Sequence, residues 1–254
     1  MKILLTNDDG VYADGITELA LALNKQGHQL ALVAPDRERS ASGHAITLHH
    51  PLRALKITRS AIPDITAYRV SGTPADCIKL ALEKLIKFKA DLIISGINHG
   101  PNLGLETLYS GTVSAAIEGW MLGHSSIAVS MNYSEKSDFK KAAQYIADLL
   151  KDDSVLNISD HFLLNINFPA ELKDNTEMKV TKLGKTLYND SFVERTDPMG
   201  NRYFWLAGNN RDLKSDDTDI CAYLNNKISI TPLKADLTDE KELQKLKNNF
   251  KKRK

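Results

Sequence analysis

The chain has 254 residues, of which 42% are hydrophobic and 26% are charged, values typical of a globular protein. Its 33 basic and 32 acidic residues give a net charge of +1, so the composition offers no basic excess that would indicate a nucleic acid as partner. No uncharged apolar run approaches the roughly 18 residues of a membrane-spanning helix, and the apolar segment 3–5 is too short for the core of a signal peptide. We therefore expect a cytoplasmic protein that does not contact a membrane.

Cysteine and histidine are placed in ways that disfavour two further classes. Cys77 and Cys221 lie far apart and form no CxxC pair, as is typical of reduced thiols in a cytosolic protein. Only His49 and His50 are adjacent, and they lack the i, i+4 spacing of a helical zinc site. The basic residues 251–254 are interpreted as a solvated terminus. The sequence therefore favours neither a disulfide framework nor a zinc enzyme of that type.

Strand-like and helix-like segments alternate along the first two-thirds of the chain. Residues 3–6 form a short apolar run that predicts a buried strand, and Ile16, Leu19, Ala20 and Leu23 follow the spacing of one helical face. Further strands are predicted at 30–34, 92–94, 127–129 and 162–168, and further helices from Thr73 through Leu85, over 112–122 and over 139–150. Because several of these strands are apolar on both faces, the pattern predicts an α/β fold with a mostly parallel sheet and helices on both faces.

The pattern changes after Pro169. Short β-like runs at 180–183, 203–206 and 228–231 have polar connections, and a charged helix is expected from about Asp239. We therefore predict an α/β catalytic core over 1–169 and a β-rich extension over 170–254, which includes a strand returning to the core and the charged C-terminal helix. Residues 186–217 are too polar to form a core of their own but contain five aromatic residues. Such an arm usually needs a partner surface, so we expect at least a homodimer.

Polar, glycine-containing segments follow three of the predicted strands. They are residues 6–10, 35–43 and 95–104. In an open parallel sheet, ligands bind at the carboxyl ends of the strands, so these three segments are expected to meet at one edge.

Two adjacent carboxylates, Asp8 and Asp9, follow the first strand. Such a pair is costly unless a cation lies between the carboxylates, or one of them stays protonated. Together with oxygens from Ser40 and Asn98 the pair would make an all-oxygen site, which suits one Mg²⁺ or Mn²⁺ ion. The ordinary alternative is that the segment ending at Gly10 is only a strand-to-loop turn with an N-cap.

A second candidate, Ser110-Gly111-Thr112, directly precedes a predicted helix with small residues in its first turn. Free N–H groups, hydroxyls and a glycine at a helix N-terminus are typical of a phosphate site, although simple N-capping is the alternative. The chain has no GxGxxG, P-loop or GxSxG motif, which disfavours dinucleotide-binding proteins, P-loop NTPases and α/β-hydrolases. A haloacid dehalogenase-type phosphatase would need a second aspartate at position 10 or 11, where Gly10 and Val11 stand.

Five motifs, in this order along the chain, resemble the SurE family of metal-dependent survival-protein nucleotidases. They are MKILLTNDDG at 1–10, APDRERS at 34–40, SGTPADC at 71–77, SGINHGPNLG at 95–104 and YSGTVSAAIEG at 109–119. The segment ISITPL at 228–233 matches as well, so the resemblance covers about residues 1–234.

The resemblance implies a Rossmann-like fold with a C-terminal β-hairpin used in dimer and tetramer exchange. It also implies a phosphatase acting on nucleoside 5′-monophosphates, often on 3′-monophosphates, and on short polyphosphate in some members. The family's metal ligands correspond to Asp8, Asp9, Ser40 and Asn98. Its phosphate contacts correspond to Asn102, Ser110, Gly111 and Thr112.

The sequence thus favours a metal-dependent phosphomonoesterase that hydrolyses nucleoside monophosphates with a metal-activated water, with Asp8 and Asp9 as its catalytic residues. The alternative is a sensor that binds nucleotides or other phospho-ligands with little turnover. Release of phosphate in the presence of Mg²⁺ or Mn²⁺ would distinguish the two.

Overall fold

The structure is a computed structural model that describes the chain except for residues 63, 157, 186–187, 211–216 and 252–254. Its strands are β1 (Lys2–Thr6), β2 (Gln29–Pro35), β3 (Ala54–Ile57), β4 (Thr66–Val70), β5 (Leu92–His99), β6 (Ser125–Met131), β7 (Leu163–Phe168), β8 (Met178–Val180), β9 (Tyr188–Thr196), β10 (Arg202–Asn210) and β11 (Ile228–Pro232). Its α-helices are α1 (Asp14–Lys25), α2 (Pro74–Leu80), α3 (Gly111–Met121), α4 (Phe139–Leu149), α5 (Asp153–Leu156), α6 (Asp219–Leu224) and α7 (Glu240–Lys251). A π-helix (Ala81–Leu85) follows α2, and a 3₁₀ helix (Gly104–Leu108) precedes α3.

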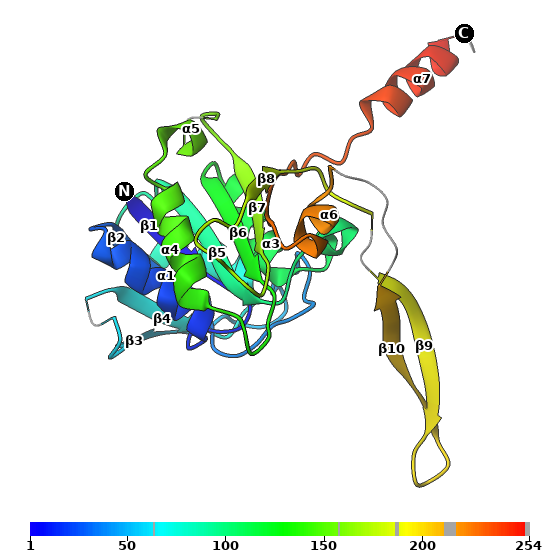
Figure 1. Ribbon diagram of the computed structural model, residues 1–254, viewed down its shortest axis with the longest axis horizontal. Coiled ribbons are helices and arrows are strands. Elements are labelled where there is room, and N and C mark those ends of the chain that lie inside the picture. Colours follow the sequence, from blue (N-terminus) through cyan, green and yellow to red (C-terminus); the bar gives the residue numbers. More distant parts are fainter. Residues whose placement is uncertain (63, 157, 186–187, 211–216, 252–254) are drawn as a thin grey trace.

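Nine strands of the described residues form one sheet, in the order β3-β4-β2-β1-β5-β6-β7-β11-β8 (Figure 1). The six from β4 to β7 are parallel, while β3 and β11 pair antiparallel with β4 and β7. The chain builds outward from β1 through β2 to β4, then returns to place β5 on the other side of β1. The predicted α/β fold is therefore confirmed, and its switch point lies between β1 and β5, where such sheets bind ligands.

Helices cover both faces of the sheet. In Figure 1, α1 and α4 lie side by side in front of it, and α3 lies behind. Alternate residues of β1 pack on opposite faces: Ile3 and Leu5 join the cluster that contains Leu19 of α1, whereas Leu4 joins the cluster that contains Ala115 of α3. All of these side chains are fully buried, and each leucine buried in this way contributes about 1.5–3 kcal/mol.

The strand predicted at 92–94 is longer than expected. After Ser95 its pairing with β6 is interrupted, and it resumes at Asn98, opposite Ser130. Gly96 makes this possible, because its φ is +138° and a Cβ at this position would lie only 2.2 Å from the carbonyl oxygen of Val129. Asn98 therefore lies on the strand and not in the loop after it.

The helix expected from Thr73 begins as predicted but does not continue through Leu85. Thr73 and Asp76 form a capping box, with the Thr73 side chain accepting from the Asp76 N–H and the Asp76 side chain accepting from the Thr73 N–H. The α-helix ends at Leu80, and the predicted continuation is the π-helix.

Two segments project from the rest of the chain in Figure 1: the antiparallel hairpin formed by β9 and β10, and helix α7. Helix α7 has no buried residue. Within the part of the chain that the structure describes, no helix combines the length and the apolar character needed to span a membrane.

The close approach at Gly96 leads to a stability prediction. We expect Gly96→Ala to lower the free energy of unfolding by about 3 kcal/mol, because the new methyl group meets the Val129 carbonyl and the backbone must also accept a left-handed φ. Urea unfolding followed by circular dichroism measures the loss. Gly123→Ala is the matched control, since Gly123 has a φ of +88° but no atom within 4 Å of the added Cβ. The control should lose only about 1 kcal/mol, and equal losses would contradict the prediction.

Candidate metal and phosphate site

Asp8 and Asp9 lie in the loop that leaves β1 at the switch point. The turn itself is closed by Asn7, whose side chain donates to the Gly10 carbonyl at 2.9 Å and accepts from the Gly10 N–H at 3.2 Å. Helix α1 has Ala13 at its N-cap and no side-chain cap. The two aspartates therefore serve neither as the turn residue nor as the helix cap, which argues against the ordinary interpretation of this segment.

Three donors bring other parts of the chain to the aspartates. The N–H of Arg39, in the loop after β2, donates to the Asp8 carbonyl at 2.7 Å. The Thr112 hydroxyl, in the first turn of α3, donates to the Asp8 carboxylate in a short hydrogen bond. The N–H of His99, at the end of β5, donates to the Asp9 carboxylate at 3.2 Å. As a result, the ends of β1, β2 and β5 meet the N-terminus of α3.

The structure places the two remaining predicted metal ligands as follows. The Asn98 side-chain N–H donates to the Gly100 carbonyl at 2.8 Å, which leaves the amide oxygen as the group that can accept or coordinate. Ser40 directly follows Arg39, and its hydroxyl donates to Glu38 at 2.7 Å. Ser40 thus follows a residue whose N–H is bound to Asp8, and its own hydroxyl is bound to a neighbouring acid in this structure.

Both aspartates have raised pKa values. Burial raises the pKa of Asp8 to about 6, with a further contribution from the charge of Asp9 and against the Thr112 hydrogen bond. Burial also raises the pKa of Asp9 to about 6, with Glu38 acting in the same direction and the His99 N–H acting against it. No cationic side chain of the described residues forms an ion pair with either aspartate. The protein alone therefore holds two poorly compensated carboxylates next to each other.

Such a donor set fits a hard divalent cation. Asp8 is only 4% exposed, so water does little to stabilise its charge. In the described part of the chain, no group of three or more His, Cys, Asp or Glu side chains is gathered as metal ligands. A cation at the pair would thus need neutral oxygens such as those of Ser40 and Asn98. Oxygen-only coordination is the preference of Mg²⁺ and Mn²⁺.

The predicted phosphate residues lie at the start of α3. Ser110 is its N-cap, and its hydroxyl oxygen accepts from the Val113 N–H at 3.1 Å. A Cβ on Gly111 would lie 2.9 Å from the Asp8 Cβ, so only glycine lets the helix approach the aspartates this closely. The Thr112 hydroxyl is bound to Asp8. The structure therefore brings Gly111 and Thr112 against Asp8. The hydroxyl oxygen of Ser110 acts as the N-cap of α3, as the alternative interpretation expected.

Asn102 is held by a buried polar network that sequence reasoning missed. Its N–H donates to Asn167 and its side-chain N–H to Ser130, both at 2.7 Å. Its carbonyl accepts from the side chains of Asn165 and Asn167. The available signal was the presence of polar residues inside the otherwise apolar strands β6 and β7, where all three network partners are fully buried.

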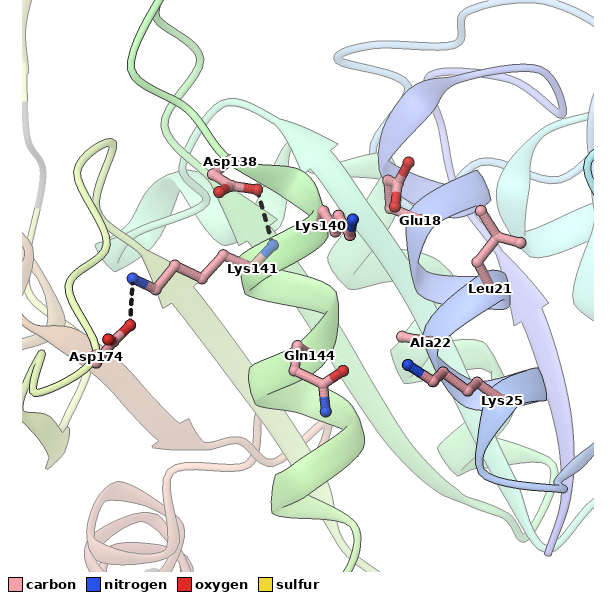
Figure 2. A pocket seen from close by; sticks show the side chains of 9 residues that line it. All are labelled: Glu18, Leu21, Ala22, Lys25, Asp138, Lys140, Lys141, Gln144 and Asp174. Carbon is pink, nitrogen blue, oxygen red and sulfur yellow. Dashed lines mark hydrogen bonds and ion pairs between the residues drawn. The ribbon is translucent and has the colours of Figure 1, made fainter.

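A groove between α1 and α4 has a volume of about 600 Å³ (Figure 2). It is lined by Glu18, Leu21, Ala22, Lys25, Asp138, Lys140, Lys141, Gln144 and Asp174. On the side of α4 away from α1, Lys141 pairs with Asp174 at 2.7 Å (Figure 2). Because none of the predicted site residues lines this groove, the switch point remains the candidate site. The fold and that site together define a doubly wound α/β protein with an acidic, oxygen-lined centre.

Comparisons with known proteins identify the family. The model of the survival protein SurE matches residues 3–190. A 5′-nucleotidase SurE of Alkaliphilus metalliredigens is 47% identical, with 98% of each chain covered, and one of Gloeobacter violaceus is 46% identical, with 94% of this chain and 92% of the relative covered. The crystal structure of the SurE protein from Aquifex aeolicus matches with a TM-score of 0.84 at 38% identity, covering 98% of this chain and 99% of that one. The chain belongs to the SurE family.

Because the two aspartates are crowded, Asp9→Asn should affect the melting temperature differently with and without metal. At pH 8 both carboxyl groups are ionised, and a folded-state pKa of about 6, above the ordinary 3.8, means that folding is opposed by this charge. In EDTA the variant should therefore melt no lower than the unsubstituted protein. Mn²⁺ should raise the melting temperature of the unsubstituted protein by several degrees but leave that of the variant almost unchanged.

Asp64→Asn is the control for this experiment. It makes the same charge change at an exposed residue near the amino-terminal end of β4, away from the site. The control should respond to Mn²⁺ as the unsubstituted protein does. An Asp9→Asn protein with a full Mn²⁺ response would show that the aspartate pair is not the metal site.

Proposed function

We propose that this chain is a metal-dependent 5′-nucleotidase, a phosphoric monoester hydrolase that releases phosphate from nucleoside 5′-monophosphates. The observation that carries the proposal is the Asp8–Asp9 pair, in which Asp8 is buried and Asp9 half-buried. The pair has no cationic partner among the described residues, and Asp8 contacts the N-terminus of α3. The names of the relatives, which match over almost the whole chain, support the same activity.

We assign one Mg²⁺ or Mn²⁺ ion to Asp8, Asp9, Ser40 and Asn98. When bound, such an ion neutralises phosphate charge and lowers the pKa of a coordinated water. The protein's part is to keep the donors in place: the Thr112 hydroxyl fixes the carboxylate of Asp8, and the His99 N–H fixes that of Asp9. Both hydrogen bonds also favour the ionised forms that a cation requires.

The phosphate is assigned to the N-terminus of α3, at Ser110, Gly111 and Thr112, and to Asn102. Free N–H groups and the helix dipole favour an anion there, and they stabilise the charge that develops during transfer. The Thr112 hydroxyl is bound to Asp8, and its backbone N–H also acts on that carboxylate, so Thr112 links the aspartate to the proposed phosphate position. All of these groups contact phosphate and not a base, so 3′-monophosphates and short polyphosphate are further proposed substrates.

A phospho-ligand sensor would need the N-terminus of α3 but not two unpaired carboxylates beside it. The aspartates raise the cost of binding an anion unless a cation is also present, and they are therefore a feature of hydrolysis and not of simple binding. The free cysteines, with Cys77 buried, agree with a proposed location in the cytoplasm.

The decisive measurement is phosphate release from a panel of nucleoside 5′- and 3′-monophosphates. With Mn²⁺ or Mg²⁺ we expect turnover of the 5′-monophosphates, loss of turnover in excess EDTA, and its return when the metal is restored. Asp9→Asn should lose activity by orders of magnitude, whereas Asp64→Asn should keep it. Binding of nucleotide without turnover at any metal concentration would instead indicate a sensor.

We further propose that residues 1–169 are the catalytic core and that residues 170–254 serve in oligomerisation. On the hairpin, Phe192, Phe204 and Leu206 share one face, with 72%, 56% and 61% of each residue exposed. A two-stranded hairpin is only marginally stable by itself, and an exposed apolar face of this kind is typical of a contact with another chain. A homodimer, or a homotetramer built from it, would cover this face.

Sedimentation tests the assembly at micromolar concentration. The unsubstituted protein should sediment as a dimer or tetramer, and Phe204→Asp should shift it toward the monomer because a charge is then placed on the apolar face. Leu237→Asp is the control, since Leu237 is 85% exposed but lies outside the hairpin. A monomeric unsubstituted protein would contradict the proposal.

A further inference from the structure

The Ser42 hydroxyl is one of several buried polar groups around the candidate site that have no partner among the described residues; Thr6, Ser95 and His99 supply others. The Oγ atom of Ser42 is buried, yet it makes no hydrogen bond with any residue that the structure describes. Most buried polar groups in folded proteins are paired, so one left unpaired calls for an explanation. At the edge of a ligand site, the simplest explanation is that the partner is the ligand.

The position of Ser42 supports this explanation. Its Oγ lies 3.0 Å from the point where a Cβ on Gly111 would be, and the Asp8 Oδ2 atom is equally close to that point. The hydroxyl therefore lies over the first residue of α3, on the side where the helix meets the aspartates. Ser42 belongs to segment 35–43, which the sequence predicted to lie at this edge of the sheet, but it was not among the residues assigned to metal or phosphate.

The neighbouring hydroxyls already have structural tasks. That of Thr112 donates to Asp8, and the oxygen of Ser110 accepts from the Val113 N–H as the helix cap. Ser40 donates to Glu38. Of the four hydroxyls around the start of α3, Ser42 is the one with no partner in the described part of the chain.

The two residues that follow Ser42 hold this part of the loop in place. The Gly43 N–H donates to the Tyr109 carbonyl at 3.0 Å, which attaches this loop to the segment just before α3. The His44 side chain pairs with Glu118 at 2.7 Å, and the Glu118 side chain is only 5% exposed. A donor fixed in this way needs no reorganisation when an anion arrives, which is the condition for strong electrostatic stabilisation.

We propose that Ser42 Oγ–H donates a hydrogen bond to a non-bridging oxygen of the substrate phosphate, beside the N–H groups at the start of α3. The inference rests on the proposed function and adds a phosphate-binding residue to it. The donor recognises the tetrahedral oxyanion itself, so inorganic phosphate, the reaction product, should bind to it as well.

The test compares Ser42→Ala with Ser229→Ala. Both replacements remove a buried hydroxyl that has no partner among the described residues. Ser229 lies in β11, opposite Asn167, and is not one of the residues assigned to the metal or the phosphate. For Ser42→Ala we expect kcat/KM for a nucleoside 5′-monophosphate to fall about 10²-fold, as for other lost donors in preorganised sites. The inhibition constant of inorganic phosphate should rise at least about tenfold by the same argument.

Two further readouts separate this role from a structural or metal-binding one. In EDTA the Ser42→Ala protein should melt no lower than the unsubstituted protein, because an unpaired buried hydroxyl contributes nothing to stability. The rise in melting temperature with Mn²⁺ should also be unchanged. Ser229→Ala should keep unsubstituted kinetics and phosphate inhibition.

Three other outcomes would contradict either the role of Ser42 or the proposed function. Normal kinetics and normal phosphate inhibition in Ser42→Ala would overturn the inference while leaving the proposed function intact. Loss of the Mn²⁺ response in Ser42→Ala would make the hydroxyl a metal contact and would also overturn it. Absence of phosphate release from the unsubstituted protein would contradict the proposed function itself, which distinguishes the two failures.

Discussion

The arrangement of the candidate site depends on two neighbouring carboxylates, the buried Asp8 and the half-buried Asp9, at the switch point of the parallel sheet. Burial is the main reason why the pKa of each aspartate is raised to about 6, neighbouring acidic charges add to it, and no cationic side chain of the described residues forms an ion pair with either one. A fold that only needed a turn after β1 has Asn7 and Gly10 for that purpose. The charges of Asp8 and Asp9 therefore do not serve the stability of the turn, and groups with pKa values perturbed in this way are typical of functional sites.

The surrounding chain is arranged to hold this pair. The loop after β2 and the last residue of β5 reach it through the backbone N–H groups of Arg39 and His99, which any residue type except proline supplies. Helix α3 reaches it through the Thr112 side chain and through Gly111, where the residue type does matter. The positive end of α3 thus lies beside the negative aspartates, which is a favourable interaction.

The sequence predicted the order of strands and helices around the site better than the local backbone shape that places each side chain. Alternation of apolar strands and helices is a local signal, and it predicted α1, α3, α4 and the polar strand ends. The shape of β5 was not predictable, because Asn98 reaches the site only through the irregular pairing around Gly96, which depends on the position of Val129 across the sheet.

The same limit applies to contacts between distant residues. The hydrogen bond from Thr112 to Asp8 and the close approach of the Ser42 hydroxyl to Gly111 both bring together positions far apart in the chain. No spacing rule in the sequence indicates either contact. Likewise β3 and the π-helix depend on neighbours and not on local preference. The short, half-exposed β3 shows no clear alternation, and the π-helix residues read as a plain continuation of α2.

A third buried aspartate shows why burial alone does not make a binding site. Asp219 is fully buried, and burial raises its pKa, yet its carboxylate accepts hydrogen bonds from the N–H groups of Gly104, Gly184 and Ile220. With three donors its charge has a structural task, unlike the charges of Asp8 and Asp9.

That task joins the C-terminal part of the chain to the site. Gly104 ends the segment that carries Asn98 and Asn102, and the N–H of the following Leu105 donates to the Lys185 carbonyl at 2.7 Å. Leu103 packs against Ile220 in a small apolar cluster of its own. The residues beyond 169 therefore do more than carry the hairpin. By holding Gly104 and Leu103 they fix the end of the loop that follows Asn98 and contains Asn102. A partner bound through the hairpin would thus act on a segment directly continuous with the one that anchors the site.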